Sequence, residues 1–128
     1  MNLASNGWFR TTLIACLLAV LHAQAAFASD LTARQVTLRL FQAEEGSKVD
    51  FSDLNLTLID LSGLNFKKAV FVGADLYGAD LSGSNMSGTD LSFTRLDRAS
   101  IINADFSGAD LTDATLLRPT TFSNTDFD

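Results

Sequence analysis

The sequence predicts an all-β solenoid, in which the chain turns repeatedly in one direction and stacks on itself, and two observations support this prediction. An apolar residue recurs at every fifth position through residues 74–92, which read ADLYG ADLSG SNMSG TDLS. A small residue stands two positions before each apolar residue, and serine or glycine usually follows it. A fixed internal period of this kind is the signature of a repeat architecture.

The odd period requires a corner in every unit. Because successive side chains of a strand point to opposite faces, the small residue at i−2 and the apolar residue at i can both point inward. The next small residue, at i+3, would face outward on a straight strand, so the chain must turn before it. Pairs such as Ser82-Gly83 stand at this point, and small, permissive residues favour turns. A helix is disfavoured, because a five-residue step advances about 500° and spreads the leucines around its axis.

The repeat unit resembles the pentapeptide repeat, A-[DN]-L-x-x, over about the last two-thirds of the chain. The resemblance implies a right-handed quadrilateral parallel β-helix with four units, and therefore twenty residues, in each coil. We expect this pentapeptide-repeat solenoid to occupy residues 49–128. Its central apolar residues are Phe51, Leu56, Leu61, Phe66, Phe71, Leu76, Leu81, Met86, Leu91, Leu96, Ile101, Phe106, Leu111 and Leu116.

Residues that are one coil apart are predicted to stack in the interior. The expected stacked sets are Phe51 with Phe71, Leu91 with Leu111, and Phe66 with Met86 and Phe106. Bulky residues at the usually small positions of the early units predict a wider first coil; they are Leu54, Ile59 and Leu64. After Leu116 the register slips by one residue because Pro119 is inserted, and a bulge or loop at Arg118-Pro119 would absorb the slip.

Residues 29–48 are predicted to form a short N-terminal capping helix and the lead-in to the coil. The helix is expected over residues 30–46, with Ser29 or Asp30 as its N-cap and Gly46 as its terminator. Its apolar stripe comprises Ala33, Val36, Leu40 and Ala43. The middle of this segment also alternates like a strand, and a partner-binding helix is the functional alternative to a cap.

Residues 1–28 are predicted to be a secretory signal peptide, which would place the chain in the periplasm or outside the cell. Arg10 precedes an apolar run from Leu13 to Leu21, and Ala26-Phe27-Ala28 has the form of a cleavage site. The run is shorter than the roughly 20 residues that span a bilayer. Two alternatives remain: cleavage after Ala23-Gln24-Ala25, and a lipoprotein anchored at Cys16, which ends a lipobox-like Leu13-Ile14-Ala15-Cys16.

Cys16 and His22 are the only cysteine and the only histidine, so residues 29–128 contain neither. This composition excludes a disulfide framework, a Cys or His metal site, and a Cys-His or Ser-His-Asp nucleophile within the mature chain. We therefore predict no enzyme activity and no cofactor. The aspartates could form an acid and base couple or bind calcium, but the repeat itself predicts Asp before each central residue, and the sequence contains no calcium-loop motif.

One side of the predicted coil departs from the acidic repeat, because its outward positions carry apolar and basic residues. A contiguous apolar patch marks a contact surface, and arginine clusters receive acidic partners. A solvated face whose charge is partly neutralised by Asp75 and Asp97 is the alternative interpretation. The candidate partner surface comprises Val70, Val72, Tyr77, Phe93, Arg95, Arg98 and Arg118.

These features favour an exported, non-catalytic structural or protein-interaction module with a protein partner. Residues 29–128 hold eight basic and fifteen acidic residues, a balance of 8 − 15 = −7, which disfavours direct binding to nucleic acid. The resemblance adds an alternative, since some cytoplasmic family members mimic DNA and inhibit the type II topoisomerase gyrase. A homodimer through the C-terminal coil is a further hypothesis, because no helix is predicted to cover Phe122 and Phe127.

Overall fold

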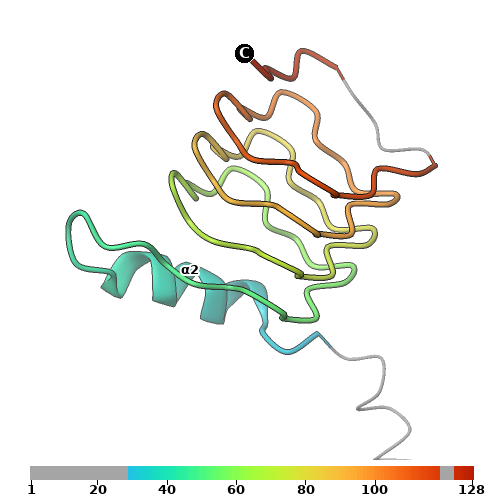
Figure 1. Cartoon of the computed structure of the whole chain (residues 1–128). Helices are drawn as coiled ribbons and strands as arrows, with labels where there is room; N and C mark the ends of the chain where they lie inside the picture. Colours follow the sequence, from blue (N-terminus) through green and yellow to red (C-terminus); the bar gives the residue numbers. More distant parts are fainter. Residues whose placement is uncertain (1–28, 119–122) are drawn as a thin grey trace, which may run out of the picture.

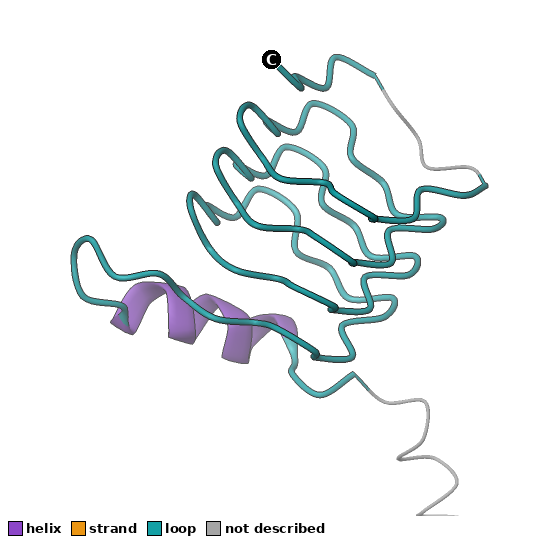
Figure 2. Ribbon diagram, in the orientation of Figure 1, coloured by secondary structure: helices purple, strands orange, loops and turns teal. Residues whose placement is uncertain are grey.

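The computed structural model describes residues 29–118 and 123–128, which form helix α2 (Ala33–Gln42) and a stack of coils. The helix lies across one end of the stack and the C-terminus lies at the other end (Figure 1). Parallel bridges join residues twenty apart, from Asp50 with Val70 to Arg95 with Thr115. Twenty residues divided by the five-residue period give four pentads in each coil, as predicted. Each pentad contributes a single bridge, so Figure 2 shows no strand arrows in the described part.

The interior contains the predicted columns. The rings of Phe51 and Phe71 stack with centroids 5.0 Å apart, and Phe66 meets Phe71 edge to face at 5.3 Å. Met86 is fully buried, and the bridges of its neighbours place it between Phe66 and Phe106 in one column. Such aromatic pairs contribute about 0.5–1.5 kcal/mol beyond the area that they bury. The apolar columns therefore join successive coils through side chains as well as through the backbone.

Each corner of the coil is a tight turn with a left-handed residue at position i+2. All pentads between residues 49 and 118 have a positive φ at this position, whether it holds a glycine or a residue such as Lys68 (φ 63°) or Phe93 (φ 60°). The N–H at i+3 donates to the carbonyl at i in each turn from 66–69 to 111–114. The N–H at i+2 donates to the next coil, as Gly83 does to Ile102 over 2.8 Å. The predicted role of the Ser-Gly pairs is confirmed.

Some of the small inward residues are polar, and the turn satisfies their hydrogen-bonding groups. The buried hydroxyls of Ser84 and Thr89 each donate over 2.6 Å to the carbonyl three residues earlier. Thr94 makes the same bond to Leu91. Within the described residues, every buried side-chain nitrogen and oxygen has a hydrogen-bond partner. Ser and Thr therefore replace Ala inside the coil without leaving a hydroxyl unpaired.

The helix is shorter than predicted, and its predicted caps are wrong. Thr32, rather than Ser29 or Asp30, is the N-cap, because its hydroxyl accepts from the Gln35 N–H while the Gln35 side chain accepts from the Thr32 N–H. This capping box places the N-cap two or three residues later than predicted. The helix ends before the extended residue Ala43, and Gly46 lies in the following turn rather than at the helix end.

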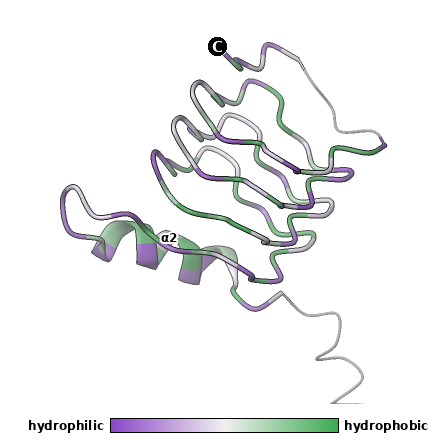
Figure 3. Cartoon of the chain, viewed as in Figure 1, coloured by the Kyte–Doolittle hydropathy of each residue, from purple (hydrophilic) through white to green (hydrophobic). Residues whose placement is uncertain are grey.

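The first coil and the helix share one apolar core. Val36 is fully buried, Ile59 is 7% exposed, and Leu54 and Leu64 pack against the same cluster. Hydrophobic and hydrophilic residues alternate around α2, and its apolar stripe supplies these contacts (Figure 3). The lead-in is also tied to the coil, because the Asp30 N–H donates to the Asn55 carbonyl and the Asn55 N–H donates to the Asp30 carboxylate, each over 2.6 Å.

The residues that follow the predicted register slip near the end of the chain confirm it. Asp105 bridges Asp126 at a spacing of 21 residues, one more than elsewhere. The rings of Phe106 and Phe127 lie 5.6 Å apart, so the shifted residue still continues its column. The predicted insertion at Pro119 lies outside the described residues, as do Phe122 and the predicted signal peptide at residues 1–28.

Replacing Gly83 by alanine tests whether the left-handed corner is a stability determinant. A Cβ at Gly83 would meet nothing within 4 Å, so the cost comes from its φ of +65°. We expect Gly83→Ala to lower the free energy of unfolding by about 1 kcal/mol in urea titrations. The reciprocal change Asp113→Gly, at a φ of 57°, should not destabilise the protein. Equal stability of Gly83→Ala and the wild type would contradict this account.

Candidate functional site

The outward aspartates are explained by the turns that they precede. Asp110 Oδ1 accepts the Thr112 N–H over 2.9 Å and the Thr112 hydroxyl over 2.6 Å. The same contacts recur with serine at Asp60 and Asp90, and with asparagine as the acceptor at Asn85. These carboxylates therefore serve as turn acceptors, in the position that the repeat predicts.

The pKa values of these carboxyls fit the same role. The pKa of Asp60 is lowered by the Ser62 hydroxyl and then by the Ser62 N–H, and the pKa of Asp110 is lowered in the same way by Thr112. A general acid in a glycosidase pair needs a raised pKa instead. No group of three or more His, Cys, Asp or Glu in the described part of the chain could hold a metal ion.

The candidate partner surface spans two neighbouring faces, the corner between them and the next corner, which holds Arg98 and Arg118. Val70 and Val72 lie on one face and are half-buried, so they are less exposed than the outward register predicted. Adjacent coils, about 4.8 Å away on either side, cover these short side chains. Phe93 stands at the corner and is 62% exposed. Tyr77 lies on the next face, together with Arg95.

The structure brings three of the predicted residues into direct contact. The Arg95 guanidinium lies 4.3 Å from the centre of the Tyr77 ring, and the Arg98 guanidinium lies 5.7 Å from it. These distances allow cation–π attraction. The result is a compact aromatic and basic cluster that Tyr77, Arg95 and Arg98 form across two successive coils.

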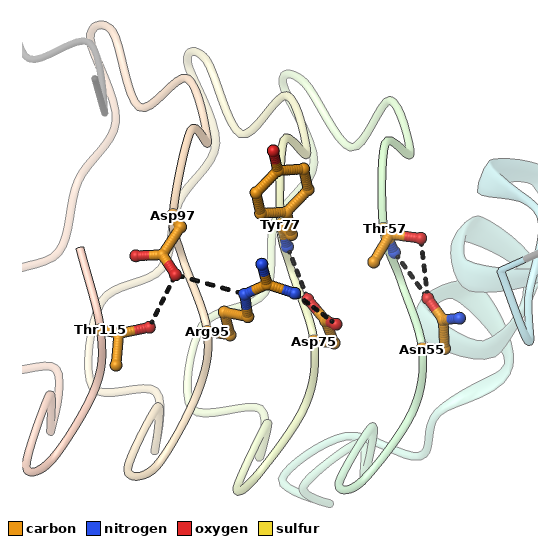
Figure 4. Close-up of polar contacts among 7 residues, drawn as sticks. All are labelled: Asn55, Thr57, Asp75, Tyr77, Arg95, Asp97 and Thr115. Carbon is orange, nitrogen blue, oxygen red and sulfur yellow. Dashed lines mark hydrogen bonds and ion pairs between the residues drawn. The ribbon is translucent and has the colours of Figure 1, made fainter. Parts of the chain in front are cut away.

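Arg95 is not free to receive an anion, because it joins two carboxylates (Figure 4). Its Nη1 pairs with Asp75 Oδ2 over 3.3 Å, and its Nε pairs with Asp97 Oδ2 over 3.2 Å. Asp97, followed by Asp75, raises the pKa of Arg95. The alternative interpretation, in which Asp75 and Asp97 neutralise the basic charge, is therefore confirmed for Arg95. Its guanidinium holds the cluster in place and offers no unpaired charge to a partner.

Asp97 extends this network into the last coil. The Leu117 N–H and the Thr115 hydroxyl both donate to its carboxylate, the hydroxyl over 3.2 Å. The Leu117 N–H, followed by Arg95 and Thr115, lowers the pKa of Asp97. Among the described residues, neither Arg98 nor Arg118 has a carboxylate within ion-pairing distance. These two arginines supply the uncompensated positive charge of the surface.

Sequence reasoning missed Leu58, which is 75% exposed and borders the same face. It occupies the left-handed corner position, at a φ of 56°, and reaches over Gly78 in the next coil. The sequence did contain a signal for Leu58: it is a large apolar residue at a position where the repeat favours glycine or a polar residue. Phe127, 46% exposed, lies in the final coil where the homodimer contact was predicted.

None of the helices in the described residues has the length and apolarity to cross a membrane.

Acidification should weaken the fold through its turn aspartates. Because the pKa values of Asp60, Asp105 and Asp110 are lowered on folding from 3.8, their contribution is present above that pH and lost as pH falls through the folded values. We expect urea midpoints to be constant from about pH 7 to pH 5 and to fall below pH 4. Replacing all three aspartates by asparagine keeps the acceptor oxygen and should reduce the fall of the urea midpoint below pH 4. If the urea midpoint of this variant fell below pH 4 as steeply as that of the wild type, the turn aspartates would not be the cause of the acid sensitivity.

Comparison with known proteins agrees with the repeat geometry. The family model for pentapeptide repeats matches residues 47–83 and 74–113 with eight copies, which is more than half of the chain. No curated protein shows a significant match. Among solved structures, the chain is similar to alr5209, a pentapeptide repeat protein from Nostoc Pcc 7120, with 33% identity over 62% of this chain and 74% of that chain, at a TM-score of 0.46.

Two further structures are similar. QnrB1, a plasmid-mediated fluoroquinolone resistance protein, is 28% identical over 55% of this chain and 36% of its own, at a TM-score of 0.43. Rfr23 from the cyanobacterium Cyanothece 51142 is 26% identical over 69% of this chain and 70% of its own, at 0.39. The chain thus spans about a third of the QnrB1 structure. With its family-model match, its twenty-residue coils and its four pentads in each coil, the chain belongs to the pentapeptide repeat family, whose fold is the right-handed quadrilateral β-helix.

Proposed function

We propose that the chain is an exported, non-catalytic protein-interaction module that binds an acidic segment of a partner protein through its candidate partner surface. The single observation that carries the proposal is the cluster of Tyr77 with Arg95 and Arg98, on a face whose first corner holds the exposed ring of Phe93. Tyrosine and arginine are enriched among the residues that dominate binding energy at interfaces.

The stacked columns show that the coil does not need these residues. Phe93 shares its corner column with Asp53, Gly73 and Asp113, all in the same left-handed conformation. Tyr77 shares its column with Thr57, which makes the same backbone contact to the residue two positions earlier. Phenylalanine is unfavourable at this position for two reasons: its apolar ring is exposed to solvent, and its backbone has a positive φ that residues other than glycine rarely adopt. Contact with a partner is the function that accounts for it.

Charge favours an acidic partner segment. Arg98 and Arg118 have no carboxylate partner among the described residues, and they share one corner column in a chain whose net formal charge is −6. The remaining surface repels an acidic partner, so that the positive side orients the encounter. An acidic segment with an apolar side chain would pair with both arginines and cover Tyr77 and Phe93.

Binding should depend on this surface and not on exposed apolar area in general. In affinity capture from the periplasm, Tyr77→Thr/Phe93→Gly should weaken binding of the captured partner at least about tenfold, since interface aromatics commonly contribute 1 kcal/mol or more each. The two replacements are residues that the same columns already carry. Arg98→Glu/Arg118→Glu should also weaken binding and reduce its salt dependence.

The matched control is Phe41→Ser/Ile102→Ser, which removes apolar area from α2 and from a different face of the coil. It should bind like the wild type. Retention of the partner by Tyr77→Thr/Phe93→Gly, or equal loss with the control, would contradict the proposal. A captured protein without an acidic binding segment would contradict the proposed partner chemistry.

Export separates this proposal from the alternative of a DNA-mimicking topoisomerase inhibitor. The composition of residues 1–28 supports export, whereas the acidic balance and the fluoroquinolone resistance named for QnrB1 motivate the alternative. Residues 1–30 fused to a reporter that is active only outside the cytoplasm should give activity, and the same fusion with Leu17→Arg/Leu18→Arg should not. A silent wild-type fusion would overturn export and favour the cytoplasmic alternative.

A further inference from the structure

The fold brings every lysine of the chain to one pocket. Lys48, Lys67 and Lys68 are the only lysines in the sequence, and all three line a pocket of about 360 Å³ together with Gly46 and Ser47. Lys48 comes from the segment that follows α2, and this segment projects beside the coils in Figure 1. Lys67 and Lys68 come from a corner of the first coil. The volume lies within the range of small-molecule sites, about 300–1,000 Å³.

The coil itself does not require lysine at this corner. The corresponding corners of the next two coils are Ser87-Gly88 and Ser107-Gly108, and they make the same hydrogen bonds. Lys68 adopts a φ of 63°, where glycine is less strained. Lys67 and Lys68 therefore replace a Ser-Gly pair that suits the turn better, and they add two positive charges to the pocket that Lys48 also lines.

The lysines of this pocket form no ion pair among the described residues, and Lys67 makes only a longer-range attraction to Asp105, whose pKa is lowered mainly by hydrogen bonds from Ser107 and also by Lys67. The ion pairs formed by the described residues involve Arg95 and no lysine, although Glu44 and Glu45 lie close in the chain. The amide N–H groups of Gly46 and Lys48 have no acceptor within the described part of the chain. Gly46 has a φ of +84°, and nothing lies within 4 Å of the position of its Cβ, so the loop leaves this side open.

We propose that this lysine pocket binds a phosphate-bearing ligand. Three ammonium groups match the charge of a phosphate of about −2, and lysine binds phosphate as a point charge with freely rotating donors. Backbone N–H groups in a turn add fixed donors of the kind found in anion-binding nests. The ligand is a small phosphorylated molecule or a phospholipid headgroup, since both present the same group. The lysine pocket shares no residue with the candidate partner surface, and its occupancy does not depend on a protein partner.

Titration with pyrophosphate tests the site directly. In ¹⁵N-resolved NMR spectra of the full chain, we expect saturable shifts of the amides of Gly46, Lys48 and Lys68, with a dissociation constant below about 1 mM. The variant Lys67→Ser/Lys68→Gly copies the neighbouring corners and should fold with an unchanged or higher Tm. It should bind pyrophosphate at least about tenfold more weakly.

The control Arg34→Gln/Arg39→Gln removes the same charge from α2 and should bind like the wild type. Co-sedimentation with phosphatidylglycerol vesicles, compared with glucose 6-phosphate titration, distinguishes a headgroup from a soluble phosphate. The proposal is overturned by an absence of saturable shifts, by equal weakening in the control, or by citrate binding as tightly as pyrophosphate, which would indicate a general anion effect.

Discussion

The structure depends on the left-handed corner that closes every pentad. The positive φ at position i+2 lets the N–H at i+3 return to the carbonyl at i, and it aims the N–H at i+2 at the next coil, as in Gly83 and Gly88. One backbone conformation thus makes both the bend within a coil and a hydrogen bond between coils. Because the corner comes every five residues, the inward side chains align in columns and the core becomes a stack.

This regularity explains why so much of the fold could be predicted from the sequence. The five-residue period and the alternation of strand side chains predict a corner in every pentad. The resemblance to the pentapeptide repeat adds four pentads in each coil, and together they place Phe51 on Phe71 and, across the inserted residue, Asp105 beside Asp126. Features that depend on irregular local contacts were not predictable in the same way. The start of α2 was misplaced because several capping residues lie close together, and only the reciprocal bonds of Thr32 and Gln35 select one.

The candidate surface was predictable in position but not in chemistry. Register alone placed Tyr77 near Arg95, yet it could not show that Arg95 is held by two carboxylates and that Val70 is half-covered by adjacent coils. The lysine pocket was not foreseen, because Lys48 belongs to the segment before the repeats and its position relative to the first coil follows from no period. In both places the proposed function rests on departures from the repeat, since the regular residues are occupied by the turns.

The central claim, that a partner contacts the departures from the repeat, is tested most directly by hydroxyl-radical footprinting of the captured complex. Side chains that lose solvent exposure on binding are oxidised more slowly. The account predicts protection of Tyr77 and Phe93, with Phe41 and Ile102 oxidised as in the free protein. Protection of Phe41 or Ile102 while Tyr77 and Phe93 remain reactive would contradict it.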